Sequence, residues 1–198
     1  MTTSEPSFAE RGGSEFLFDF DTFERMDQAG VLRLASGHVE LIEGKILQMA
    51  PISADHGDVS TNAAVSLTNR LTASGLGRDV YRVLVHVTLK IGEHSAPEPD
   101  VLVARPLDGR KYCETADAAL VVEVSISTRD GDLNIKAPLY ARAGVQELWL
   151  VEPESRKVSV LREPRPDGTW ASTTILEGDA TVSPLFAPQI SIPLSELF

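Results

Sequence analysis

Two carboxylates stand where the sequence otherwise favours apolar β-structure. Asp100 follows Pro99 and immediately precedes the run VLVA, and Glu123 lies inside the run ALVVEVSIS. Acidic residues are poor strand formers, and burying an unpaired carboxylate costs free energy. At the ends of adjacent strands, two carboxylates can bind one divalent cation, because Mg²⁺ takes hard oxygen ligands. The pattern predicts a Mg²⁺ or Mn²⁺ site at Asp100 and Glu123, with the backbone carbonyl of Val124 as a candidate third ligand.

Each carboxylate also has a structural interpretation. An aspartate after proline at a strand entry, taken alone, is more often a turn or capping residue, and this applies to Asp100. Glu123 has aliphatic neighbours on both sides. If it faces the interior it needs a cation, a proton or a lysine partner, whereas an edge position facing solvent needs none. We favour a functional role for Glu123, because buried ionisable groups concentrate at functional sites.

A lysine suited to act with these carboxylates lies in the next helical segment. Asp132, Lys136 and Tyr140 are four residues apart, so they share one face of a regular helix. A lysine there can orient a water molecule or stabilise charge that develops on a phosphate. Pro138 follows two residues after Lys136. Since proline lacks the helical N–H, the helix either begins near Lys136 or kinks at Pro138.

The other segments supply a sheet and the helices that position these residues. We expect a short helix over 19–30, capped by Asp19 or Asp21, and a hairpin over 38–51 with its turn at Glu43–Gly44. A long helix is expected over 55–74 with Asp55 or Asp58 as its N-cap, because apolar residues recur every four positions (Val59, Ala63, Leu67 and Leu71). A third helix should occupy most of 128–145. Strands are expected at 79–91, 98–105, 118–127, 146–153, 157–164 and 167–176.

This order predicts an α/β (α+β) fold in which a mixed central β-sheet is flanked by helices. The length of 198 residues suits a single domain, which we place at 17–198 after a flexible N-terminal arm at 1–16. No apolar run is long enough to span a bilayer and no signal peptide is visible, so no membrane association is expected. The single cysteine, Cys113, excludes an internal disulfide, and a cytoplasmic location is the default expectation.

The net charge of −11, from 29 acidic and 18 basic residues, argues against a broad surface for nucleic acid. A local basic groove, or an acidic site neutralised by divalent metal, remains compatible with that charge. The simplest interpretation of the charge alone is a soluble protein whose copies repel one another.

Three stretches together resemble a known family. They are VELIEGKILQMAPISADH, EPDVLVA and LVVEVSISTRDGDLNIKAPLYARAGVQELWLVEP, which occur in the family's order between about Val39 and Val160. The set resembles the Uma-type putative restriction endonuclease family, within the PD-(D/E)xK nuclease superfamily. The segment KAPLYARAGVQELWLVEP is the most diagnostic part. The resemblance implies a restriction-endonuclease-like core, Mg²⁺ or Mn²⁺ as cofactor and DNA as substrate.

The resemblance also assigns residues. It matches Asp100 and Glu123 to the metal-binding carboxylates, with Val124 beside them. Ser125 replaces the usual lysine of the catalytic strand, and Lys136 is the helix lysine that takes its place. The remaining matches are the tyrosine one turn after that lysine, the acidic residue of the first hairpin and the histidine that opens the long helix: Tyr140, Glu43 (less favourably Glu40) and His56. For His56, a capping or surface role is equally compatible with the sequence.

Three functional hypotheses follow. The first is a metal-dependent endonuclease that hydrolyses DNA phosphodiester bonds. The second is a catalytically inactive module of the same fold that binds a partner. The net charge, Pro138 and Ile126 favour it, since Ile126 stands where the family that the chain resembles usually has the proline of a Ser-Pro-Ser-Thr turn. Hydrolysis of another phosphate or ester is the third, since fold alone does not decide activity. A homodimer formed through a sheet edge or a helix is also expected, by analogy with related folds.

Overall fold

The computed structural model describes residues 14–34, 38–125 and 131–198. Most of the predicted arm at 1–16 therefore lies outside the described residues, as do Ile126, Ser127 and Thr128. The helices are α1 (Phe20–Gln28), α2 (Ala54–Ala73) and α3 (Gly131–Arg142), with short 3-10 turns at Val31–Leu34, Thr115–Asp117 and Leu194–Glu196. The strands are β1 (Val39–Ile42), β2 (Lys45–Gln48), β3 (Arg82–Val85), β4 (Leu89–Lys90), β5 (Val101–Ala104), β6 (Cys113–Glu114), β7 (Ala118–Val124), β8 (Glu147–Glu152), β9 (Lys157–Pro164), β10 (Trp170–Glu177), β11 (Thr181–Val182) and β12 (Ile192–Pro193).

The centre of the fold is a six-stranded sheet in the order β10-β9-β8-β7-β5-β3. Strands β7 and β8 pair in parallel, and the other neighbours in this sheet are antiparallel. A parallel pair needs a crossover connection, which α3 provides. The predicted mixed sheet flanked by helices is therefore confirmed.

Helix α2 covers one face of the sheet. Its apolar face at Val59, Ala63, Leu67 and Leu71 is buried against Val101, Val103 and Val122, as the spacing predicted. The predicted N-cap is wrong, however. Ser53 caps the helix, and its hydroxyl accepts a hydrogen bond from the backbone N–H of His56 at 3.3 Å. Serine and aspartate both cap helices well, so the sequence alone did not show whether Ser53 or one of the nearby aspartates would be the N-cap.

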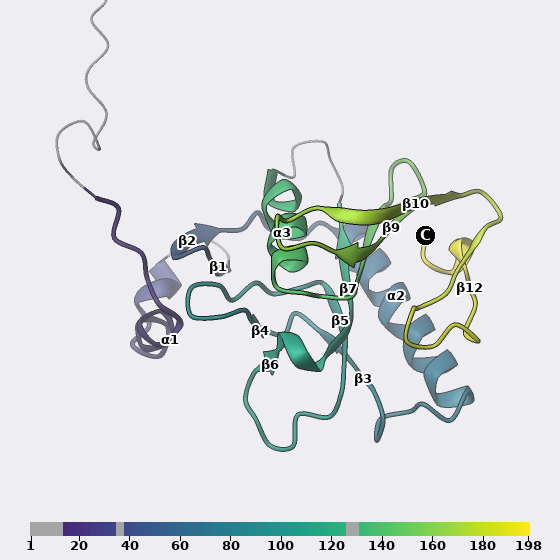
Figure 1. The fold of residues 1–198 in the computed structure, drawn as a ribbon, viewed down its shortest axis with the longest axis horizontal. Helices are drawn as coiled ribbons and strands as arrows, with labels where there is room; N and C mark the ends of the chain where they lie inside the picture. Colours follow the sequence, from purple (N-terminus) through teal and green to yellow (C-terminus); the bar gives the residue numbers. More distant parts are fainter. Residues whose placement is uncertain (1–13, 35–37, 126–130) are drawn as a thin grey trace, which may run out of the picture.

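Helix α3 packs on the opposite face of the sheet. Tyr140 and Val145, at and beyond its C-terminal turn, are buried with Leu102, Val121 and Leu148. In Figure 1, the β1–β2 hairpin and α1 lie at one end of the molecule, and the C-terminal segment with β12 lies at the other.

The expected strand over 79–91 is divided in two. Strand β3 pairs with β5 in the central sheet, whereas β4 pairs with β6 in a separate two-stranded sheet. Between them, His86 has a φ of +49°, in the left-handed region that interrupts a strand. β-Branched composition alone predicted a continuous strand, and that expectation was wrong at this residue.

The β1–β2 hairpin formed as expected, with Ile42 opposite Lys45 at its turn. Gly44 has a φ of +77°, and a Cβ added there would lie 2.6 Å from the Cβ of Leu17. Leu41 and Ala96 form an isolated antiparallel bridge. This bridge fixes the hairpin against the loop that leads into Asp100, so β1 contributes to the surroundings of the two predicted carboxylates.

Candidate active site

The sheet register brings Asp100 and Glu123 together. Val101 of β5 lies opposite Val122 of antiparallel β7. Asp100 precedes Val101 and Glu123 follows Val122, so the two carboxylates occupy neighbouring positions at one end of the two strands. Both side chains are buried, and both line an open cavity of about 260 Å³ together with Val124, His56 and Lys136.

Asp100 is held by contacts from two elements. Its Oδ2 accepts a hydrogen bond from the backbone N–H of Val124 at 2.7 Å and lies 3.2 Å from Nε2 of His56. Its Oδ1 lies 3.9 Å from Nδ1 of His86. Val124 thus contacts the site through its N–H, and a metal-ligand role for its carbonyl stays a prediction. The first turn of α2 and the end of β7 together fix the orientation of the Asp100 carboxylate.

Glu123 is deeply buried among polar groups. The hydroxyl of Tyr140 donates a hydrogen bond to its Oε1 at 2.6 Å, and Nζ of Lys136 lies 3.7 Å from the same oxygen. Burial raises the pKa of Glu123 to about 8, with smaller upward contributions from the charges of Asp100 and Glu40. Lys136 and the Tyr140 hydrogen bond act in the opposite direction. The carboxylate form is therefore costly here unless additional positive charge is present.

Lys136 lies between carboxylates from two different parts of the fold. Its Nζ donates to Oε1 of Glu40 at 2.9 Å and also approaches Glu123. Burial alone would lower the pKa of Lys136, but the carboxylates of Glu123 and Glu40 outweigh it and raise the pKa above its ordinary value. Lys136 is therefore a charged ammonium group aimed into the cavity. Tyr140, one turn further along α3, is fully buried, and burial followed by the charge of Glu123 keeps the pKa of its hydroxyl well above the usual range.

The hairpin carboxylate that reaches this group is Glu40, the less favoured alternative in the sequence. Glu40 is 1% exposed on β1, whereas Glu43 lies in the turn with a φ of +50°, is exposed and pairs with Arg142. The structure therefore does not bring Glu43 to the cavity. Glu40 on β1 reaches Lys136, whereas Glu43 in the turn pairs with Arg142 at the C-terminal end of α3, outside the cavity. Oε2 of Glu40 is buried and has no hydrogen-bond partner among the described residues.

Helix α3 begins at Gly131, well before Lys136. Pro138 therefore lies inside the helix rather than in its first turn. Because proline has no backbone N–H, the carbonyl of Asn134 cannot accept the usual helical hydrogen bond from residue 138. Lys136 and Tyr140 nevertheless face the same carboxylate, as their spacing predicted. The side chain of Asp132, the third residue of the predicted face, lies outside the described part of the chain.

Three further titratable residues at the cavity were not identified from the sequence: His38, His86 and Glu98. Nε2 of His38 lies 3.6 Å from Oε1 of Glu40, and this interaction raises the pKa of His38 although partial burial opposes it. Burial raises the pKa of the Glu98 carboxyl. None of the three carries a distinctive sequence signal: His86 occupies a polar position of the alternating pattern at 82–89, and its φ of +49° is visible only in the structure.

The cavity thus joins Glu40, Glu98, Asp100 and Glu123 around one lysine, with His56 and His86 beside Asp100. Within the described residues, no group of three or more His, Cys, Asp or Glu side chains is arranged to hold a metal ion. Oxygen donors from Asp100 and Glu123 suit a hard cation, and such ions usually complete their shell with water and substrate oxygens. The chemistry of these two carboxylates therefore fits a hard divalent cation. None of the helices in the part of the chain described by the structure has the length and apolar character to cross a membrane.

Comparison with known proteins agrees with this architecture. A solved structure described as a putative nuclease belonging to DUF820 from Anabaena variabilis superposes with a TM-score of 0.67, covering 87% of this chain and 96% of that one at 20% identity. The fold is accordingly that of a restriction-endonuclease-like protein. The Uma2 family model, described as "Putative restriction endonuclease", matches residues 20–195, so the chain belongs to this family. No curated protein matches the chain.

Proposed function

We propose that this protein is a metal-dependent endonuclease that hydrolyses DNA phosphodiester bonds at the cavity formed by Asp100, Glu123 and Lys136. The observation that carries the proposal is the pairing of two buried carboxylates on adjacent strands with a charged lysine in one open cavity. Burial raises the pKa of Glu123. A divalent cation would stabilise the ionised carboxylate there and offset that cost.

Asp100 and Glu123 would hold Mg²⁺ or Mn²⁺, together with water and the substrate phosphate. When bound, such a cation neutralises charge on the phosphate oxygens and lowers the pKa of a bound water molecule. The orphaned Oε2 of Glu40 supports the same assignment, because a buried carboxylate oxygen without a donor is costly. Glu40 would add a third carboxylate beside the cation and hold Lys136 through the 2.9 Å hydrogen bond.

The chain's own residues position the reactants. The ammonium group of Lys136 can hold the attacking water or a non-bridging phosphate oxygen, since both are acceptors within reach of the cavity. Tyr140 fixes Glu123 through the 2.6 Å hydrogen bond. The contact of His56 with Oδ2 of Asp100 orients the second carboxylate. These contacts join α2, β7 and α3. The packing of the two helices against the sheet therefore holds the carboxylates next to Lys136.

The direct test uses isosteric variants, Asp100→Asn and Glu123→Gln, assayed on plasmid and linear DNA with Mg²⁺ or Mn²⁺. Each should lower cleavage by about 10²-fold or more, while circular dichroism shows a retained fold. Glu154→Gln is the matched control, because it makes the same charge change at an exposed position between β8 and β9. Full activity in both site variants would refute the assignment. A wild-type protein that binds DNA without cutting it under either metal would support the inactive binding module instead.

A further inference from the structure

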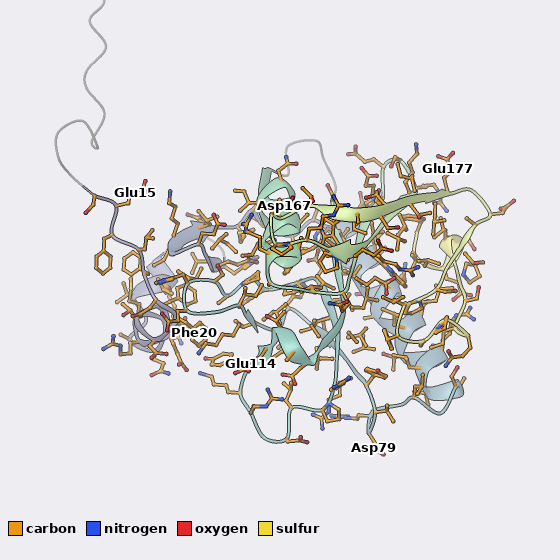
Figure 2. All side chains as sticks on the ribbon, in the orientation of Figure 1. Glu15, Phe20, Asp79, Glu114, Asp167 and Glu177 are labelled. Atoms are coloured by element: carbon orange, nitrogen blue, oxygen red, sulfur yellow. The ribbon has the colours of Figure 1, made fainter. Side chains whose placement is uncertain are left out.

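A second cavity, of about 270 Å³, lies between the C-terminal half of α2 and the edge strand β3. Its lining includes Arg78 and Arg82, together with Thr68 and Thr72 of α2. It shares none of its lining residues with the candidate active site. In Figure 2, Asp79, the neighbour of Arg78 in the chain, lies at the bottom edge of the view, away from the position of α3 in Figure 1. The two cavities are therefore separate.

The two arginines of this cavity have no carboxylate partner among the described residues. Other arginines do, such as Arg110 with Asp117 and Arg162 with Glu147. Nε of Arg82 is buried and has no hydrogen-bond partner within the described chain. A buried donor left without an acceptor destabilises the ligand-free protein. The chain has 29 acidic residues, yet none of those described pairs with Arg78 or Arg82. An acceptor from outside the protein is therefore suited to this position.

The ligand must bring its own acceptors. The hydroxyls of Thr68 and Thr72 donate to the carbonyls of Ala64 and Thr68, at 2.7 Å and 2.8 Å, so their protons are already used. The guanidinium groups of Arg78 and Arg82, together with the hydroxyl of Tyr81, are donors available at the cavity. A guanidinium presents a planar fork of N–H groups that matches the oxygens of a phosphate. The cavity is accordingly suited to a phosphate group.

Strand β3 links this cavity to the candidate active site. Arg82 begins the strand, and His86, which lies beside Asp100, follows its end. Four residues of extended chain span roughly 13 Å. One strand of B-form DNA advances about 3.4 Å per nucleotide along the helix axis, so this span corresponds to about four nucleotides for a duplex whose axis runs along β3.

We propose that Arg78 and Arg82 bind a backbone phosphate of the DNA substrate, about four nucleotides from the bond that is cut. This inference rests on the proposed function, since it takes DNA as the substrate of the Asp100 and Glu123 site. The arginine cavity contributes affinity and sets the length of duplex that the protein needs, but it reads no base, because phosphate contacts carry no sequence information directly.

The test measures DNA binding by fluorescence anisotropy in EDTA, so that no cleavage is required. Arg78→Gln and Arg82→Gln should each weaken the affinity for a long duplex by about fivefold or more. The slope of log affinity against log salt should become shallower by about one, as expected when one phosphate contact is lost. Arg156→Gln is the control. Arg156 is exposed in the turn between β8 and β9, away from β3 in the sheet order, and its guanidinium lies over the ring of Phe198, 5.2 Å from the ring centroid.

Duplex length and inorganic phosphate supply the remaining comparisons. Shortening the duplex by steps of one base pair should remove the difference between wild type and the arginine variants at a defined length. Equal affinities for wild type, Arg78→Gln and Arg82→Gln, or equal losses in Arg156→Gln, would overturn the proposal. Inorganic phosphate that binds only when both arginines are present, with unchanged DNA affinity, would also overturn it and identify a free-phosphate site.

The proposed nuclease function can fail separately. If the arginine variants lose DNA affinity as expected while wild-type protein cuts no DNA with Mg²⁺ or Mn²⁺, the phosphate subsite stands and the hydrolytic activity does not. Because Arg78 is exposed, its replacement does not disturb the core, and Arg78→Gln keeps the test valid even if Arg82→Gln folds poorly.

Discussion

Replacing Glu123 by glutamine should stabilise the metal-free protein, and the stabilisation should grow as the pH rises. Glu123 is 4% exposed, and burial raises its pKa from an ordinary value of 4.5 to about 8. A group whose pKa is higher in the folded state binds a proton more tightly there than in the unfolded chain. Its stabilising contribution is complete below pH 4.5 and is lost as the pH rises through about 8. Glutamine resembles the protonated form and does not titrate.

The size of the effect follows from the same shift. Each pKa unit corresponds to about 1.36 kcal/mol, so the free energy of unfolding of wild type should fall by about 3–4 kcal/mol relative to Glu123→Gln between pH 5 and pH 8. Other titrating groups, such as His38, are present in both proteins and largely cancel in the difference. Glutamine also retains an oxygen that can accept the Tyr140 hydrogen bond, so the two proteins should be close in stability at pH 5.

The assay is urea unfolding followed by tryptophan fluorescence in EDTA at several pH values between 5 and 8. Glu154→Gln, an exposed substitution with the same charge change, should track wild type at every pH. A difference between Glu123→Gln and wild type that stays constant across this range, or that shrinks as the pH rises, would refute the reasoning. Glu123 would then be ionised in the folded protein without metal, with Lys136 sufficient to balance it.

Further predictions concern the neighbours of this carboxylate and the hairpin. Glu40→Gln should destabilise the protein by about 3 kcal/mol and reduce DNA cleavage, because it removes a partner of buried Lys136, whereas Glu43→Gln should change stability by less than about 1 kcal/mol. Tyr140→Phe should slow cleavage by about 10-fold or more at unchanged fold, through loss of its hydrogen bond to Glu123, as measured by single-turnover kinetics. Gly44→Ala should lower the unfolding free energy by at least about 1 kcal/mol in thermal melts, since its φ is +77° and the new Cβ would overlap Leu17.

The sequence predicted the parts of the fold that depend on local pattern. The apolar spacing of α2 identified its buried face, and the run at 118–127 identified β7, the strand of Glu123. The N-cap of α2 and the break at His86 were not predictable in this way. Several residues near Ser53 can cap a helix with similar free energies, and a left-handed residue inside a β-branched run is imposed by tertiary contacts rather than by its neighbours in sequence.

The candidate site shows the same division. The cost of a carboxylate in an apolar strand pointed to Asp100 and Glu123, and helical spacing placed Lys136 and Tyr140 on one face. The choice of Glu43 over Glu40 was different in kind, because it depended on which of the two glutamates meets Lys136 and which meets Arg142 of the same helix. The orientation of the hairpin is set by the bridge between Leu41 and Ala96. This contact joins residues that are far apart in the chain, so it leaves no local pattern in the sequence.

The electrostatics of the cavity connect the stability and the proposed function. Four acidic side chains and one lysine line the cavity, and burial raises the pKa of both Glu98 and Glu123. Replacing buried ionic groups with apolar residues often leaves a protein equally stable or more stable, so such an arrangement is not favoured for folding alone. Its cost falls when positive charge enters the cavity, and the divalent cation of the proposed function would supply that charge. The destabilising carboxylates of the metal-free protein are, on this argument, the same groups that make binding of the cation and phosphate favourable.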